Sequence, residues 1–559
     1  MVVNLLKDIM HAKAPVHPKG ANTRILLSSV FGPYAQNDEY GSRKINPMEL
    51  YHNQVTRVQG PFSPRSFHRS FGLMFLHANI DAPCTLLDFP TMNRFIEELK
   101  TNSYDVVGIS GILPNVGKIK KMCELVRQYL PKATVVVGGH AANMPNIHDL
   151  VCADYIVRGE GVQWFRKFLG QDLNKPIRHP VVNTAFGMRV FGMELSESAE
   201  DKAATLIPSV GCPMGCNFCS TSHMFGGKGK FVNFYETGDD LFKIMCQLEE
   251  KLKVQSFGVM DENFLLHRPR ALRLLELMEE HHKSWAWIGL EGNGSQYVKL
   301  TGIDTRQLVR DLQSHGIRIL GSSIIGLEEH AHDTIDAAID WAVSHDTDFH
   351  QFMLYTPLPG TPLYLQHRKE GTLLSEDEIP YADIHGQLRF NYRHKNIRNG
   401  EETEFLLRAF RRDFEVNGPS IARMIRTTLL GWKRYKNHPN ARIQRRYARE
   451  SRNLATTFAG TIWAMRKWYH HDKPMKKKLD KIFQDLVQEF GWKVNVFGFL
   501  IGSVEYITMK LEVKRLARGW TYEPATICEK NARAFEFAQA GKSSSKHGRI
   551  PAIQWVACT

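Results

Sequence analysis

Hydrophobic residues in the first third of the chain come in short runs that alternate with helical patterns. The runs "RILLSSV", "CTLLDF", "DVVGIS", "TVVVGG" and "YIVRGEG" begin at positions 24, 84, 105, 134 and 155. Continuous Val, Ile and Leu runs that end in Gly or Ser are typical of strands buried on both faces of a parallel sheet. The pattern therefore predicts a doubly wound, Rossmann-like α/β domain over residues 22–185, after a tail of residues 1–21.

The same alternation of strand and helix continues over residues 195–390. Apolar runs begin at positions 204, 256, 285, 317 and 349, and helical stretches such as residues 271–283 and 305–315 separate them. This spacing is typical of a partial (β/α) barrel, in which chemistry gathers at the carboxyl ends of the strands. Residues 391–559 have a mostly helical pattern and are predicted to form a separate C-terminal domain.

Charge is concentrated in the predicted helical region. The chain has a formal net charge of +14. Residues 391–470 contain 18 Lys and Arg against 6 Asp and Glu, a net of +12. Solvated helix faces explain such a stretch more simply than a nucleic-acid site, so nucleic acid is not an expected partner. Residues 492–511, "WKVNVFGFLIGSVEYITMKL", are apolar enough for a buried sheet or an apolar substrate wall, and burial is the preferred interpretation.

Composition places the chain among globular proteins. It has 559 residues, 43% of them hydrophobic, and its first apolar stretch is too short for a secretory signal. No run of 18 apolar residues is evident, so a soluble cytoplasmic protein without a membrane-spanning segment is expected. Nine cysteines, unevenly spaced, do not suggest a disulfide framework. A cysteine cluster is therefore a candidate metal or redox site.

Three of these cysteines lie in one short loop. "GCPMGCNFC" places Cys212, Cys216 and Cys219 in a C-x3-C-x2-C array after a predicted strand. A [4Fe–4S] cube normally takes one thiolate per iron, so three thiolates leave one iron with an open coordination position. Zinc would ask for further ligands, and the local sequence offers only His223. The array favours an iron–sulfur cluster with a reactive iron.

The array resembles that of the radical S-adenosylmethionine (SAM) superfamily, including the aromatic Phe218 before the last cysteine. The resemblance implies that the open iron chelates SAM and cleaves it to a 5′-deoxyadenosyl radical, which abstracts a substrate hydrogen. It also implies that Asp261 and Glu262 of "MDENF" lie in the methionine-binding segment, Glu291 near the ribose and Gly326 near adenine. The two acids of "MDENF" equally suit the start of a helix. The sequence pattern predicts five strands for this barrel, whereas the barrel of the superfamily has six.

The N-terminal region resembles the cobalamin-binding domain of the cobalamin-dependent branch of that superfamily. "GISGIL" with Ser110 and "VVVGGH" with Gly138 and Gly139 match strand ends that approach the nucleotide tail of the cofactor. The D-x-H-x-x-G motif is missing, so no histidine ligand to cobalt is expected. The resemblance covers roughly residues 22–450.

This resemblance implies three cofactors: a [4Fe–4S] cluster, SAM and cobalamin. The predicted function is C-methylation of an unactivated carbon, through the 5′-deoxyadenosyl radical and methylcobalamin. The expected partners are a small-molecule or lipid-like substrate and an electron donor such as flavodoxin or ferredoxin, and peripheral contact with a membrane is left open. The residues that carry the catalytic chemistry on the substrate are not assigned.

Three alternatives remain open. The same architecture supports cyclisation or rearrangement without methyl transfer. A tRNA methylthiotransferase also places a Rossmann-like domain ahead of a radical SAM barrel, although its second cluster would need loop cysteines, and Cys84 and Cys123 fall in a strand and a helical pattern. The third alternative is a degenerate homologue, because the missing strand–helix unit could abolish turnover while cofactor binding persists.

Overall fold

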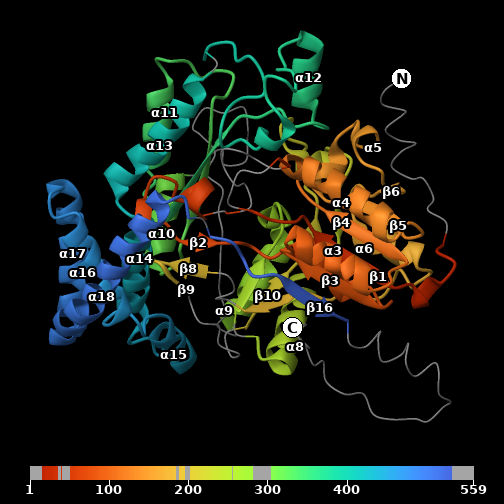
Figure 1. Ribbon diagram of the computed structural model, residues 1–559. Helices are drawn as coiled ribbons and strands as arrows, with labels where there is room; N and C mark the ends of the chain where they lie inside the picture. The colour runs from red at the N-terminus through yellow and green to blue at the C-terminus, as the bar shows by residue number, and fades with distance from the viewer. Residues whose placement is uncertain are drawn as a thin grey trace.

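A computed structural model describes most of the chain. The described residues are 16–34, 39–40, 49, 51–183, 188–194, 202–254, 256–280, 304–398, 400–520 and 522–531. Two parts of the molecule bear on function: a parallel sheet built from the N-terminal third and a set of shorter sheets and helices built from the middle of the chain (Figure 1).

The N-terminal sheet has six strands in the order β16-β3-β1-β4-β5-β6. Their bounds are Ile527–Lys530, Cys84–Asp88, Ile25–Ser29, Val106–Ser110, Thr134–Gly138 and Tyr155–Ile156. The last five strands of this order are parallel to one another, with Ile25 opposite both Cys84 and Val106. The predicted doubly wound α/β fold is confirmed.

Helices cover both faces of this sheet. Helices α2 (Phe71–Asn79) and α6 (Gly161–Phe168) pack on one face, through side chains such as Leu73 and Phe165. Helices α3 (Met92–Thr101) and α4 (Val116–Tyr129) pack on the other, through Phe95 and Ile119. The short helix α5 (Ile147–Leu150) follows β5. Burial on both faces explains why these strands are continuous apolar runs rather than alternating ones.

One edge of the sheet is completed from a distant part of the chain. Strand β16 pairs antiparallel with β3, and Cys528 lies opposite Leu87. Sequence analysis assigned this segment to the helical C-terminal region, so the strand is a departure from the prediction. Its four residues have no local feature that reveals a partner about 440 positions earlier.

The middle of the chain forms two parallel strand pairs. Strand β10 (Lys202–Leu206) pairs with β13 (Ser256–Val259), and β14 (Leu320–Ile325) pairs with β15 (Phe349–Leu354). Strand β7 (Val181–Asn183) adds antiparallel to β10. The helices are α8 (Gly238–Leu252), α9 (Arg268–Glu280), α10 (Thr305–Ser314), α11 (Ile335–Val343) and α12 (Pro362–Glu370). The strand predicted near position 285, and with it the question of a missing unit, lies outside the described residues.

Two small antiparallel sheets complete the strand set. One joins β2 (Arg65–Ser66), β8 (Met188–Val190) and β9 (Met193–Glu194). The other joins β11 (Ser209–Val210), directly before the cysteine loop, to β12 (Val232–Asn233). The second sheet therefore fixes the point at which the chain enters the loop.

The region after residue 400 is helical, as predicted, up to residue 517. Its helices are α13 (Glu401–Asn417), α14 (Ser420–Tyr435), α15 (Ala441–Glu450), α16 (Thr457–Trp468), α17 (Lys473–Phe490) and α18 (Trp492–Ala517). Helices α16, α17 and α18 lie side by side at the edge of the molecule away from the N-terminal sheet (Figure 1). Much of the basic charge here is paired with acids, as in Arg408–Asp336 at 2.9 Å and Arg412–Asp340 at 2.8 Å. These pairs favour the interpretation of solvated helix faces whose basic residues partly pair with acids of α11 (Ile335–Val343).

Helix α18 corrects two expectations. Residues 492–511 form a helix and not a sheet, and several of its large apolar side chains are exposed. Among the described residues, α18 is also long and apolar enough to cross a membrane by length and composition, a test that no segment was expected to pass. Only 28% of its most apolar window is buried. Residues that favour a strand locally instead form a helix, in which Val494 faces inward whereas Val496 and Ile507 are exposed.

Candidate functional site

A cavity of about 440 Å³ lies between the N-terminal sheet and the cysteine loop. The sheet contributes Ser110, Gly138 and Gly139, at the carboxyl ends of β4 and β5. The middle of the chain contributes residues next to the cysteines and the acid Glu262. Ligands of parallel α/β sheets bind at such strand ends, and the volume is within the usual range for small-molecule sites.

The sheet side of the cavity is shaped by Gly139. Its backbone lies at φ 77° and ψ −170°, a conformation that is essentially restricted to glycine. A Cβ at this position would lie 2.6 Å from the Gly111 carbonyl oxygen and 2.7 Å from the Ser110 Oγ atom. At Gly138 a Cβ would meet only the Val157 carbonyl oxygen, at 3.8 Å. Contacts within the protein therefore require glycine at position 139, and the Gly-Gly strand end presents bare backbone at the cavity wall.

The cysteine loop lies between β11 and the short helix α7 (Ser220–Met224). Cys212 is buried, and Cys216 and Cys219 are partly exposed. Ser222 holds the loop from inside: its hydroxyl donates to the Cys212 carbonyl oxygen at 2.6 Å and accepts from the Gly215 backbone N–H at 3.1 Å. The Ser222 side chain thus closes the loop by bonding to its backbone at two points.

The donor set of this loop fits a cube better than a single ion. Within the described part of the chain, no three His, Cys, Asp or Glu side chains converge as ligands of one metal ion. In a [4Fe–4S] cluster each thiolate binds a different iron, so the thiolates do not converge on a single point. The candidate zinc ligand His223 is directed through Nε2 to the Cys216 carbonyl oxygen at 3.2 Å. These contacts disfavour the zinc interpretation.

The cysteine loop is tied directly to the N-terminal sheet by two residues that sequence analysis missed. The Asn143 side-chain amide donates to the Ser220 carbonyl oxygen at 3.0 Å, and His140 Nδ1 lies 3.3 Å from the Ser220 hydroxyl. Burial lowers the pKa of His140. Each of the two positions adjoins a predicted motif, since His140 directly follows the Gly-Gly strand end and Ser220 directly follows Cys219, but no local pattern indicates their contact. Together these contacts join the two sides of the cavity.

The two acids of "MDENF" have different environments. Asp261 accepts from the Ser209 hydroxyl and forms a 3.2 Å ion pair with Arg270, and both side chains of the pair are 2% exposed. Glu262 instead lines the cavity, and loss of water around its carboxyl raises its pKa, while hydrogen bonds from its own backbone and from that of Gly211 oppose the shift. Asp261 is therefore engaged in holding the strand end, and Glu262 is the acid available to a ligand.

The other residues predicted to contact SAM do not line the cavity in the part of the chain that the structure describes. Phe218 contacts the ring of Tyr355 edge-on, with centroids 5.8 Å apart, and so packs the cysteine loop against the end of β15. Gly326 follows β14 with φ 79°, and a Cβ there would lie 2.3 Å from the Phe390 ring. That packing by itself accounts for the glycine, and its contact with adenine stays a prediction. Glu291 lies outside the described residues.

Two N-terminal cysteines are separated by the sheet itself. Cys84 is buried in the core on one face, and Cys123 of α4 is buried in the core on the other. Burial raises the pKa of each thiol above its usual range. They cannot share a second iron–sulfur cluster, which argues against the methylthiotransferase alternative.

Comparison with known proteins gives independent information. A family model for the B12-binding domain matches residues 71–169. A Pyrococcus horikoshii protein described as an uncharacterised methyltransferase, PH0819, is 22% identical over 53% of this chain and 76% of its own length. An anaerobic magnesium-protoporphyrin IX monomethyl ester cyclase from Rubrivivax gelatinosus is 20% identical over 48% of this chain and 59% of its own length.

Among solved structures, one match is the radical S-adenosylmethionine methyltransferase TsrM from Kitasatospora setae with tryptophan and a SAM analogue bound. Its TM-score is 0.42 at 16% identity, over 63% of this chain and 78% of that one. The B12-binding model covers the strand ends β4 and β5 that line the cavity, together with helices on both faces of the sheet.

Proposed function

We propose that this member of the cobalamin-dependent radical SAM family is a methyltransferase that acts on an unactivated carbon of a small or lipid-like molecule. The cofactors predicted from the sequence, a [4Fe–4S] cluster, SAM and cobalamin, are those of the family. The observation that carries the proposal is a cavity lined by both the Gly-Gly strand end of the sheet and the flank of the cysteine loop. A methyl carrier on one side and a radical source on the other can then reach one substrate carbon.

When bound, the cluster and SAM supply the 5′-deoxyadenosyl radical that removes a substrate hydrogen, and cobalamin supplies the methyl group. The chain's part is to hold and align these groups. Cys212, Cys216 and Cys219 would hold three irons, and the bare backbone at Gly139 would receive the cobalamin tail. The cavity lining includes many apolar side chains, which exclude water from the reacting atoms.

Alignment of the two sides depends on protein contacts already present. Hydrogen bonds join Asn143 and His140 to Ser220 and hold the cysteine loop against the sheet side of the cavity. Displacement of a reacting group by about 1 Å can cost on the order of 100-fold in rate. These two residues are therefore proposed to set the spacing between the two cofactors.

The first test concerns the cluster. After anaerobic reconstitution, replacing Cys212, Cys216 and Cys219 by Ala should abolish the broad visible absorption of the cluster and all formation of 5′-deoxyadenosine from SAM. The matched control is Cys246→Ala, which removes a partly exposed thiol of α8 and should change neither. A triple variant that retains its cluster would refute the assignment.

The second test separates methyl transfer from cyclisation and needs no substrate. Reduced protein loaded with cobalamin is mixed with SAM that carries a ¹³C-labelled methyl group. Transfer of the label to the bound cobalamin supports a methyltransferase. Formation of 5′-deoxyadenosine without label transfer would favour the cyclase alternative, which the Rubrivivax gelatinosus relative brings into consideration.

A further inference from the structure

Helix α18 presents two very different faces. Its inward face consists of Val494, Gly498, Gly502, Glu505, Met509 and Glu512, all buried. This face packs closely on α16: a Cβ at Gly502 would lie 2.7 Å from the Gly460 carbonyl oxygen. The two helices therefore approach at backbone distance, and α18 is firmly seated along that side.

The outward face of α18 is a continuous apolar stripe. At helical spacing it carries Trp492, Val496, Phe499, Leu500, Val504, Ile507 and Leu511, which are 43–68% exposed. The stripe covers twenty residues, or about 30 Å at 1.5 Å per residue. Isolated exposed apolar residues are common on proteins, but a contiguous stripe of this size marks an interaction surface.

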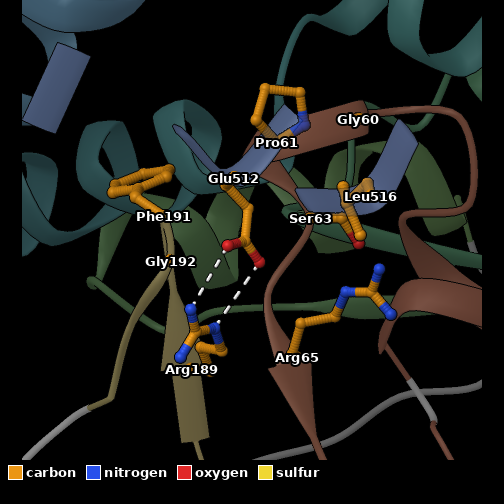
Figure 2. A pocket seen from close by; sticks show the side chains of 9 residues that line it. All are labelled: Gly60, Pro61, Ser63, Arg65, Arg189, Phe191, Gly192, Glu512 and Leu516. Carbon is orange, nitrogen blue, oxygen red and sulfur yellow. Dashed lines mark hydrogen bonds and ion pairs between the residues drawn. The ribbon is translucent and has the colours of Figure 1, made fainter. Parts of the chain in front are cut away.

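Charged residues of α18 also divide between the two faces, with the acids inward and the bases outward. Its two acidic residues, Glu505 and Glu512, are buried, whereas all four of its basic residues are exposed: Lys493, Lys510, Lys514 and Arg515. Glu512 is paired with Arg189 of β8 at 3.2 Å, with both side chains at most 8% exposed. Figure 2 shows this pair, which joins the carboxyl-terminal half of α18 to the sheet beneath it. The outward surface of α18 is therefore apolar and cationic, with no anionic group of its own.

We propose that α18 docks the protein on an anionic phospholipid membrane, lying flat with its apolar stripe in the headgroup region. Such helices bind by apolar burial combined with attraction of Lys and Arg to acidic lipids. The buried ion pair to β8 and the close contact with α16 hold the helix against the protein, so it lies on the bilayer and does not cross it. This proposal is independent of the proposed enzymatic function.

A second copy of the chain is a poorer partner for this face. In a two-fold dimer with antiparallel α18 helices, Lys493 of one copy would approach Lys510 and Lys514 of the other at both ends of the stripe. Like charges would then meet in a partly desolvated interface, which is unfavourable. In an anionic membrane, by contrast, the acidic headgroups pair with the lysines while the headgroup region buries the apolar stripe.

The experiment is co-sedimentation of the full-length protein with vesicles of phosphatidylcholine, with and without 30% phosphatidylglycerol. The wild type should bind the anionic vesicles, and added salt should weaken the binding. Lys493→Gln together with Lys514→Gln should weaken it about 30-fold, from about fivefold per lysine. The matched control, Lys120→Gln with Lys132→Gln, removes two exposed lysines of the N-terminal sheet region and should have no effect.

Apolar variants complete the test. Leu500→Gln together with Ile507→Gln should weaken vesicle binding at least tenfold while helical circular dichroism and the thermal midpoint are unchanged, because both side chains are more than half exposed. Equal binding of all variants would overturn the proposal. So would a concentration-dependent dimer that the Leu500/Ile507 variant converts to monomer, since a second copy would then occupy the face.

Discussion

Replacing Gly139 by Ala tests whether bare backbone is required at the cavity wall. The added methyl would lie 2.6 Å from the Gly111 carbonyl oxygen and 2.7 Å from Ser110 Oγ, closer than real Cβ contacts. A non-glycine residue in such a backbone conformation costs about 1–3 kcal/mol, and overpacking costs a further 1–3 kcal/mol. The free energy of unfolding should therefore fall by about 2–6 kcal/mol.

Gly138→Ala is the matched control. Its nearest new neighbour is the Val157 carbonyl oxygen at 3.8 Å, an ordinary contact, so its free energy of unfolding should stay within about 1 kcal/mol of wild type. The assay is urea unfolding of the cofactor-free protein under anaerobic conditions, followed by circular dichroism. Cobalamin uptake is then measured by absorbance, and Gly139→Ala should lose it. If the two variants unfold within about 0.5 kcal/mol of each other, the argument from close backbone approach is wrong.

Three further predictions follow from buried groups. Burial raises the pKa of Glu505 to about 8, so its carboxyl keeps a proton in the folded state, and the protein loses stability as pH rises from about 4.5 to 8. Glu505→Gln should therefore be more stable than wild type at pH 8.5, by roughly 3–5 kcal/mol, and as stable as wild type near pH 4. Urea unfolding measures both. Asp413→Ala should cost about 3–5 kcal/mol in the same assay, because it leaves Arg423, 1% exposed, without its 2.7 Å ion-pair partner; a loss below 1 kcal/mol would contradict this. Gly326→Ala should lower the thermal midpoint by several degrees, since its Cβ would overlap the Phe390 ring, and Phe390→Leu should partly restore it.

Local patterns predicted the N-terminal sheet well because each strand carries its own signal. The runs that became β3, β4 and β5 are continuous Val, Ile and Leu segments that end in turn residues, and burial on both faces leaves no other way to hide them. The cavity residues Ser110, Gly138 and Gly139 followed from the same reasoning, because the carboxyl ends of parallel strands open at one edge.

The departures and omissions came where tertiary packing decides between local alternatives. Residues 492–511 are rich in β-branched and aromatic residues, yet Gly498 and Gly502, four residues apart, allow a helix to approach α16 closely. The engagement of Asp261 with Arg270 depends on where α9 packs, which spacing alone does not reveal. The same holds for the contact of His140 with Ser220, which joins residues eighty positions apart.

The pairing of β16 with β3 has a consequence for folding during synthesis, because the two strands leave the ribosome at very different times. Its partner β3 is synthesised about 440 residues earlier, which at 5–20 residues per second is an interval of tens of seconds. Throughout that interval one side of β3 is an edge without a partner strand, on a largely apolar strand, and is a ready template for another nascent chain. Chaperone binding at the exposed strand, or slow initiation that keeps neighbouring chains apart, would protect the chain during that interval.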